Sequence, residues 1–236
     1  MRKIDTSFGA YEFEVAPLYV GEKRINKVIA KRNLLILKRV LDDNDIRFGL
    51  LYGTLLGAVR ENDFIDHDED IDVFILSERL HQFLDLLFIL REVGLIVARY
   101  DERGFLSLIR DGEYIDIYFF GPYRQGLRKC CALVLPEKFL TDLSQLSFLG
   151  EDFCVPRNYI EYLEFEYGND WKIPKVYSHT KLGLMLNQLK YFINDIMPLP
   201  IRRFILKKIE NKRINNTLPK LEKFGYILKP TSSNEG

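Results

Sequence analysis

The acidic residues of the segment 68–76, DEDIDVFIL, have a spacing that suits the binding of a divalent cation. Asp68, Asp70 and Asp72 occupy every second position, and an apolar run from Val73 to Leu76 follows. In a β-strand such side chains point to one face, about 6.5–7 Å apart along the strand. Left without a partner, they would repel one another and raise each other's pKa. Hard oxygen ligands suit Mg²⁺ or Mn²⁺, so the pattern predicts that these aspartates bind one of these metals.

Two other interpretations explain the acidic segment less well. A calcium-binding EF-hand loop starting at Asp66 would need Gly at its sixth position and Glu at its twelfth, where the sequence has Ile71 and Ser77. A solvated acidic loop accounts neither for the strict alternation nor for the apolar residues that follow. Divalent-metal binding therefore remains the favoured interpretation.

Sixteen residues upstream of Asp70, the pair Gly53-Thr54 stands between an apolar strand-like run and a helix-like run. Such a junction presents unpaired N–H groups and a hydroxyl to an anion, and Gly53 allows the backbone to approach it closely. Arg60 follows at a distance from which its guanidinium can bind a phosphate. Each feature alone is common in proteins, but together with the aspartates they predict a phosphate site formed by Gly53, Thr54 and Arg60.

These motifs resemble a known family. A Gly-Thr pair between strand and helix, then Asp70-Ile71-Asp72 on a strand, then Asp116 in YIDIYFF, resembles the polymerase-β-type nucleotidyltransferase fold. More specifically, YGTLLGAVRENDFIDHDEDIDV is similar to the signature of the LicD/fukutin family, and FEYGNDWKIP at 165–174 to a later element of that family. The similarity covers about 30–180. The chain departs from the family at 66–67, where Asp-His replaces the common Pro-Trp, and at Glu69, where Asp is usual.

The resemblance implies a metal-dependent enzyme. It would transfer a phospho-alcohol, such as phosphocholine or a polyol phosphate, from a CDP-activated donor to a hydroxyl of a cell-surface glycan or lipid-linked glycan. Asp70 and Asp72 would be metal ligands with Asp68 assisting, and Asp116 would be the third ligand or the base for the acceptor hydroxyl. The expected cofactor is Mg²⁺ or Mn²⁺, and no nucleic acid is expected as a partner.

Two alternatives stay open. The first is a nucleotidyltransferase that moves NMP from an NTP to a small molecule, RNA or protein. The second is a binding protein without enzymatic activity that a metal stabilises. Release of CMP or of pyrophosphate distinguishes the two enzymatic reactions.

The elements that position these residues predict an α+β fold: a nucleotidyltransferase-type mixed sheet flanked by helices, with a helical C-terminal region. The turn residue Gly112 predicts an antiparallel hairpin, and Thr54 is the expected N-cap of the helix after the first strand. Helices are expected at 22–43, 54–61, 77–93 and 156–168, and strands at 46–53, 68–76, 95–100, 105–111, 113–120 and 129–136.

Charge is unevenly distributed along the chain. Lys+Arg and Asp+Glu both number 34, but 181–230 holds eleven basic residues and three acids. We therefore expect a catalytic domain over 1–180 and a basic helical region over 181–236, broken at prolines that include Pro219. Apolar residues lie among basic ones over 201–213, which predicts contact with an anionic membrane surface. Packing of a helix onto the catalytic domain explains the same pattern.

The remaining bulk features concern localisation. The start of the chain, MRKIDTSFGAYEFEV, has no apolar core typical of a leader, and no apolar run approaches the eighteen or so residues that cross a bilayer. The three cysteines form no Cys-x-x-Cys pair, which favours a reducing compartment. The expectation is a cytoplasmic protein, peripheral to the inner face of the membrane.

Overall fold

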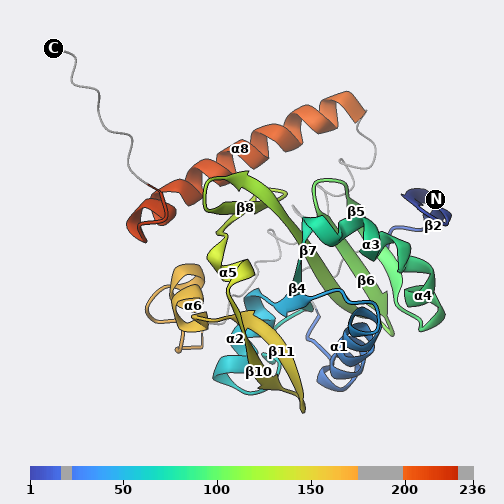
Figure 1. The fold of residues 1–236 in the computed structure, drawn as a ribbon, viewed down its shortest axis with the longest axis horizontal. Helices are drawn as coiled ribbons and strands as arrows, with labels where there is room; N and C mark the ends of the chain where they lie inside the picture. Colours follow the sequence, from blue (N-terminus) through green and yellow to red (C-terminus); the bar gives the residue numbers. More distant parts are fainter. Residues whose placement is uncertain (17–22, 175–198, 228–236) are drawn as a thin grey trace.

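A mixed sheet of nine strands forms the centre of the part that the computed structural model describes, which comprises residues 1–16, 23–174 and 199–227. Its strand order is β10-β11-β3-β4-β7-β6-β5, and β8 and β9 extend the sheet from the far end of β7 (Figure 1). A separate hairpin, β1 (Arg2–Thr6) and β2 (Gly9–Phe13), precedes it. The strands of the main sheet are β3 (Phe48–Leu50), β4 (Asp70–Leu76), β5 (Ile96–Asp101), β6 (Phe105–Arg110), β7 (Glu113–Arg124), β8 (Leu127–Cys130), β9 (Leu133–Pro136), β10 (Leu143–Phe148) and β11 (Glu151–Pro156).

Helices flank this sheet, as the predicted α+β class requires. The described helices are α1 (Lys27–Asp42), α2 (Tyr52–Arg60), α3 (Leu80–Asp85), α4 (Leu87–Glu92), α5 (Lys138–Thr141), α6 (Tyr159–Tyr167) and α8 (Leu199–Lys223), with a 3-10 turn at Ser77–Arg79. In Figure 1, α1 lies beside the strands, whereas α8 runs across one end of the sheet beyond β8. The sequence prediction of a mixed sheet flanked by helices with a helical C-terminal region is confirmed.

The parallel pair β4 and β7 organises the sheet. In its register Asp70 lies beside Tyr114 and Asp72 beside Asp116. Because side chains alternate along a strand, the residues between these acids point to the opposite face. That face is apolar and fully buried, and its residues are Ile71, Val73, Ile75, Ile115, Ile117 and Phe119. Burial of this face supplies hydrophobic free energy to a pair of strands that also carries buried acids.

Helix α1 begins where a polar side chain satisfies its first turn. The Asn26 side chain accepts a hydrogen bond from the Ile29 N–H at 3.2 Å, as an N-cap should. The buried residues then recur at helical spacing, and they are Ala30, Asn33, Leu34, Leu37, Val40 and Leu41. Asn33, although polar, is satisfied because its amide donates to the Arg110 carbonyl at 2.8 Å. The helix predicted over 22–43 is thus confirmed, with a start at Lys27.

The predicted hairpin between β6 and β7 is also confirmed. Arg110 pairs with Glu113 across a two-residue turn. Asp111 and Gly112 both have positive φ, at 50° and 80°, which is the backbone that such tight hairpins require and that Gly adopts at low cost. This turn sets the register that places Ser107 beside Asp116.

The second half of α8 packs onto the sheet domain. Glu210 forms ion pairs with Arg103 at 3.2 Å and with Lys129 at 2.7 Å. Ile214 and Leu221 are buried in the main hydrophobic core. By contrast, exposed apolar side chains gather at the start of the helix, and they are Ile201, Phe204 and Ile209. Packing onto the catalytic domain is therefore observed for the second half of α8, whereas contact of 201–213 with a membrane stays a prediction.

Four local predictions were wrong. Thr54 is not an N-cap, because α2 already begins at Tyr52 with Leu51 as its N-cap. Asp68 precedes β4 instead of sharing its face, since the strand begins at Asp70. Pro219 lies inside α8 without ending it. The single strand expected at 129–136 is a hairpin of β8 and β9. The expected division of the chain between residues 180 and 181 lies outside the described residues.

If the second half of α8 is part of the hydrophobic core, Leu221→Ala should lower the free energy of unfolding by about 2–5 kcal/mol, because Leu221 is fully buried. Ile209→Ala, on the same helix but 45% exposed, is the matched control and should change it by less than about 0.5 kcal/mol. Urea unfolding followed by circular dichroism measures both. Equal effects of the two variants would contradict the packing.

Candidate active site

Four side chains form a row across four neighbouring strands on the acidic face of the sheet. Asp72 of β4 is the register partner of Asp116 on β7, Asp116 of Ser107 on β6, and Ser107 of Arg99 on β5. The Ser107 hydroxyl donates to Asp116 Oδ1, and Arg99 Nη2 contacts both Asp116 oxygens at 3.0 and 3.2 Å. Asp72 and Asp116 are only 7% and 5% exposed. The sheet therefore buries two carboxylates side by side, with one cation at the end of the row.

The turn from β3 into α2 fixes Asp72 through its backbone and its side chain. The Asp72 N–H donates to Thr54 Oγ1 at 2.8 Å, and the Asp72 carbonyl accepts from the Leu51 N–H at 3.1 Å. The Asp72 carboxylate accepts from the Gly53 N–H at 3.2 Å and from the Tyr118 hydroxyl at 3.1 Å. These four bonds hold the carboxylate in one orientation at the edge where β3 ends.

Gly53 leaves room at this turn for the side chain of Asp68. The Asp68 carboxylate lies so close to Gly53 that a Cβ on this residue would collide with it. The Asp68 backbone is in turn held by the chain before α1, since its carbonyl accepts from the Ile25 N–H at 2.8 Å. Although Asp68 lies outside β4, it thus remains beside the turn that positions Asp72.

The strained backbone of the same turn is stabilised by aromatic residues. Tyr52 has a φ of 42°, an unfavourable value for a residue other than Gly. Its N–H donates to the Tyr162 hydroxyl at 3.2 Å, and its ring packs edge-on against Tyr118 with centroids 5.3 Å apart. Tyr118 therefore links this turn to the carboxylate of Asp72, to which its hydroxyl donates.

Burial raises the pKa values of all four acids, and repulsion among the carboxylates adds to the shift at two of them. Burial raises the pKa of Asp68 to about 6, and it raises those of Asp70 and Asp72 well above the usual range. The neighbouring carboxylates raise the pKa values of Asp70 and Asp72 further. Burial also raises the pKa of Asp116, but Arg99 and Ser107 counteract part of that shift. The ionised forms of these carboxylates would therefore be stabilised by additional positive charge nearby.

By donor chemistry and strand placement, these residues fit a hard divalent cation. Asp70, Asp72 and Asp116 supply carboxylate oxygens on one face of two paired strands, and Asp68 lies next to them. Within the described ranges, however, no three Asp, Glu, His or Cys side chains converge closely enough to enclose an ion as they stand. One reason is visible in the row: Arg99 and Ser107 hold the oxygens of Asp116.

The residues predicted to bind phosphate have different surroundings. Gly53 presents its N–H to Asp72, and the Thr54 hydroxyl, which is buried, serves the backbone of Asp72. Arg60 lies at the end of α2, where Nη2 pairs with Glu61 at 2.6 Å and Nη1 donates to the Trp171 carbonyl at 3.5 Å. Gly53 and Thr54 thus lie beside the acids, whereas Arg60 is engaged by neighbours of its own.

Arg99, Ser107 and Tyr118 were not predicted as site residues from the sequence. Tyr118 follows Asp116 by two residues, so strand alternation alone could have placed it on the same face. Arg99 and Ser107 lie in strands that were predicted, but only the register between strands reveals that they flank Asp116.

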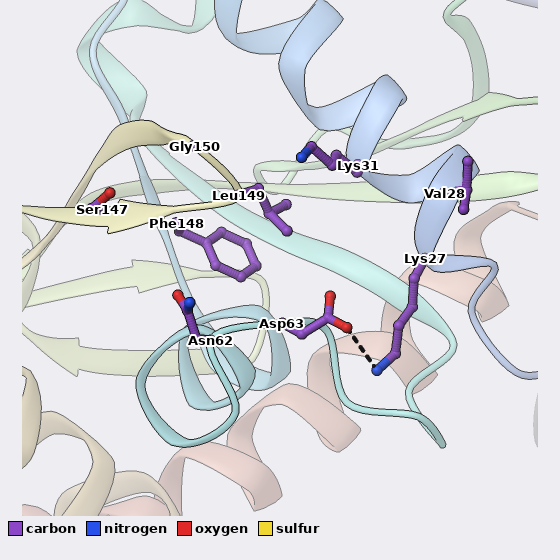
Figure 2. Close-up of a pocket in the computed structure, with 9 residues that line it drawn as sticks. All are labelled: Lys27, Val28, Lys31, Asn62, Asp63, Ser147, Phe148, Leu149 and Gly150. Carbon is purple, nitrogen blue, oxygen red and sulfur yellow. Dashed lines mark hydrogen bonds and ion pairs between the residues drawn. The ribbon is translucent and has the colours of Figure 1, made fainter.

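A pocket of about 500 Å³ lies beside the loop that leads into β4 (Figure 2). Lys27 reaches across it to Asp63 at 3.0 Å and also pairs with Asp66 at 2.6 Å. The turn between β10 and β11, with Phe148 and Leu149, forms the opposite wall. None of the four site acids lines this pocket. The two ion pairs of Lys27 instead hold the loop that carries Asp68.

Comparison with known proteins agrees with the motifs. Residues 45–158 match the family model described as LicD/FKTN/FKRP, nucleotidyltransferase domain, which confirms the resemblance drawn from the sequence. The chain is 30% identical over 175 residues to ribitol 5-phosphate transferase FKRP of Homo sapiens, covering 64% of this chain and 34% of that protein. It is 27% identical over 159 residues to ribitol-5-phosphate transferase FKTN of Macaca fascicularis, covering 61% and 33%.

The chain thus spans about a third of the length of the curated relatives it matches. Among solved structures, the antibiotic-resistance factor ANT(2'')-Ia aligns with a TM-score of 0.47 at 12% identity, over 85% of this chain and 98% of that one.

The raised pKa of Asp68 predicts how the free energy of unfolding depends on pH in the absence of divalent metal. A carboxyl group whose pKa rises from 3.8 to about 6 on folding costs nothing below pH 3.8, and its cost grows as the pH rises to 6. Asp68→Asn, which cannot ionise, should therefore match the wild type near pH 3.5. At pH 8 the free energy of unfolding of Asp68→Asn should exceed that of the wild type by up to about 3 kcal/mol, since one pKa unit equals about 1.4 kcal/mol.

Chemical denaturation across this pH range measures the difference. Asp66→Asn is the matched control, because Lys27 lowers the pKa of Asp66 and the sign should reverse. A gain for Asp68→Asn that did not depend on pH would show that ionisation is not its cause.

Proposed function

We propose that this chain, whose residues 45–158 match the family model described as LicD/FKTN/FKRP, nucleotidyltransferase domain, is a metal-dependent transferase that moves a phospho-alcohol from a CDP-activated donor to a hydroxyl of a glycan. The observation that carries the proposal is the register pair Asp72–Asp116, buried beside Asp70 with raised pKa values. A phospho-polyol is the preferred cargo, because both kinds of curated relative are named ribitol 5-phosphate transferases. Phosphocholine is the other cargo of the same chemical class.

Asp70, Asp72 and Asp116 would hold Mg²⁺ or Mn²⁺, and Asp68 would assist from the loop. The bound cation would supply charge neutralisation and polarise the phosphoryl oxygens of the donor. Asp72 is suited to this role because Gly53 and Tyr118 fix its carboxylate before any ligand arrives. Preorganised ligands of this kind lower the reorganisation needed at the moment of reaction.

Gly53 lets the donor approach the backbone closely, and Thr54 positions Asp72. Arg60 joins the phosphate contacts only if it leaves Glu61. If Asp70 and Asp72 alone hold the cation, Asp116 would instead be the base that receives the proton of the acceptor hydroxyl. Positioning and charge neutralisation are the main requirements of phosphoryl transfer.

The runner-up is transfer of NMP from an NTP, which the same fold and the same acids would support. The two reactions differ in the bond broken and in the product released. We also propose that the donor is CDP-activated, that the acceptor is a glycan, and that the protein acts in the cytoplasm at the inner face of the membrane.

The purified chain should release CMP from CDP-ribitol in the presence of Mg²⁺ and a panel of oligosaccharide acceptors. Asp72→Asn should reduce the rate by at least about 10³-fold, because it removes a ligand and charge from a preorganised site. Asp152→Asn, an exposed acid on β11, is the control and should keep the wild-type rate. Pyrophosphate released from CTP or ATP, without CMP from CDP-ribitol, would instead establish the nucleotidyltransferase.

Contact with an anionic membrane through 201–213 completes the proposal. Ile201, Phe204 and Ile209 are 52%, 60% and 45% exposed, and Lys207 and Lys208 accompany them. An apolar patch with basic neighbours suits the interface of a bilayer that contains anionic lipids. No helix within the described ranges is both long and apolar enough to cross a membrane.

Vesicles that contain phosphatidylserine should therefore retain the chain at low salt, and vesicles of phosphatidylcholine should not. Phe204→Ser should weaken this binding about tenfold, since burial of a Phe side chain contributes roughly 1.5–3 kcal/mol. Phe8→Ser is the matched control, because Phe8 is 76% exposed but lies in the N-terminal hairpin. Co-sedimentation measures both, and equal losses would rule out this part of α8 as the contact.

A further inference from the structure

Arg99 pairs with Asp116 through only part of its guanidinium group. Its Nη2 serves both oxygens of Asp116, whereas its Nε is buried with no acceptor. A guanidinium committed to a carboxylate commonly uses two nitrogens in a fork. Here the fork is incomplete, and a buried donor without a partner is unfavourable. The pairing thus leaves hydrogen-bonding capacity unused.

Aromatic rings keep this guanidinium beside the acids. Its central carbon lies 5.2 Å from the ring centroid of Phe105 and 5.8 Å from that of Tyr114. The Arg99 side chain is 21% exposed, so part of it remains in contact with solvent. A small rotation between these rings would redirect its donors without removing it from the row.

Charge balance explains why the pairing exists. Of the cations in the described residues, Arg99 alone pairs with any of the four site acids. A divalent cation bound by Asp70, Asp72 and Asp116 would need the Asp116 oxygens that Arg99 now contacts. It would also place two positive charges next to the guanidinium, and their repulsion would weaken the Arg99–Asp116 ion pair.

We propose that Arg99 is the resident counter-ion of the acidic site: a divalent cation displaces it from Asp116, and its freed guanidinium then binds a phosphate of the donor. The first half depends only on metal binding, and the second rests on the proposed function. Arg99 is therefore a positioning residue without metal and a substrate-binding residue with it. A planar set of N–H donors beside a metal suits a diphosphate.

Calorimetric titration with Mn²⁺, without any donor, tests the first half. Arg99→Gln should bind Mn²⁺ at least about tenfold more tightly than the wild type, because the competing cation is gone. Arg110→Gln is the matched control and should bind Mn²⁺ like the wild type. Arg110 is 22% exposed on the adjacent strand and contacts Asn33 and Asp111 instead of the site acids. Unchanged or weaker binding by Arg99→Gln would overturn the proposal.

Wild-type protein provides a readout that no folding defect can obscure. In ¹⁵N NMR spectra, addition of Mg²⁺ should shift the Arg99 Nε–H signal, identified by its absence in Arg99→Lys, and leave that of Arg110 unchanged. An unmoved Arg99 signal at saturating Mg²⁺ would overturn the displacement.

The second half predicts a kinetic difference. Arg99→Lys keeps the charge but lacks the planar donors, so it should raise the KM for CDP-ribitol at least about tenfold and change kcat much less. An unchanged KM would overturn phosphate binding by Arg99. If the wild type binds Mn²⁺ but transfers no phospho-alcohol, the proposed function fails while the Mn²⁺ and NMR comparisons still decide displacement. If it binds no Mn²⁺, both proposals fail.

Discussion

The pairing of Asp72 with Asp116 across two parallel strands is the constraint on which the site depends. Two carboxylates in adjacent register positions repel each other, and burial makes that repulsion costly. The surrounding structure compensates with specific donors. Gly53 and Tyr118 serve one acid, whereas Arg99 and Ser107 serve the other. The arrangement persists because the fold supplies stability elsewhere.

That stability comes largely from the other face of the same two strands. Ile71 and Val73 alternate with the acids of β4, and Ile115 and Ile117 do so on β7, all of them fully buried. A strand whose two faces differ this strongly has only one acceptable register, since a slip of one residue would place the acids in the apolar core and the isoleucines among the polar groups of the site. The apolar alternation therefore both stabilises the pair and sets its geometry.

The acids of the site could be predicted from the sequence, but not all of the residues that contact them. The alternation of Asp70 and Asp72 follows directly from the period of a strand, and the apolar neighbours of Asp116 show that it lies in one. The proximity of Asp116 to Asp72, however, depends on parallel pairing between segments more than forty residues apart, and Arg99 and Ser107 depend on two further registers. Thr54 was misassigned for a related reason: its hydroxyl accepts from the Asp72 N–H, a tertiary bond that a local capping rule cannot foresee.

Residues beyond the matched segment 45–158 also contribute to the neighbourhood of the site. The Tyr162 hydroxyl accepts from the strained Tyr52 N–H, and the Trp171 carbonyl accepts from Arg60. Burial raises the pKa of Tyr167, and the charge of Asp72 raises it further, which places this phenol near the acids. The segment FEYGNDWKIP, set apart in the sequence, therefore contacts the end of α2 through Trp171 and lies near Asp72 through Tyr167. The acids come from β4 and β7, whereas these aromatic residues come from α6 and the loop after it. Substitutions in the later segment can therefore reshape the surroundings of the carboxylates without changing the carboxylates themselves.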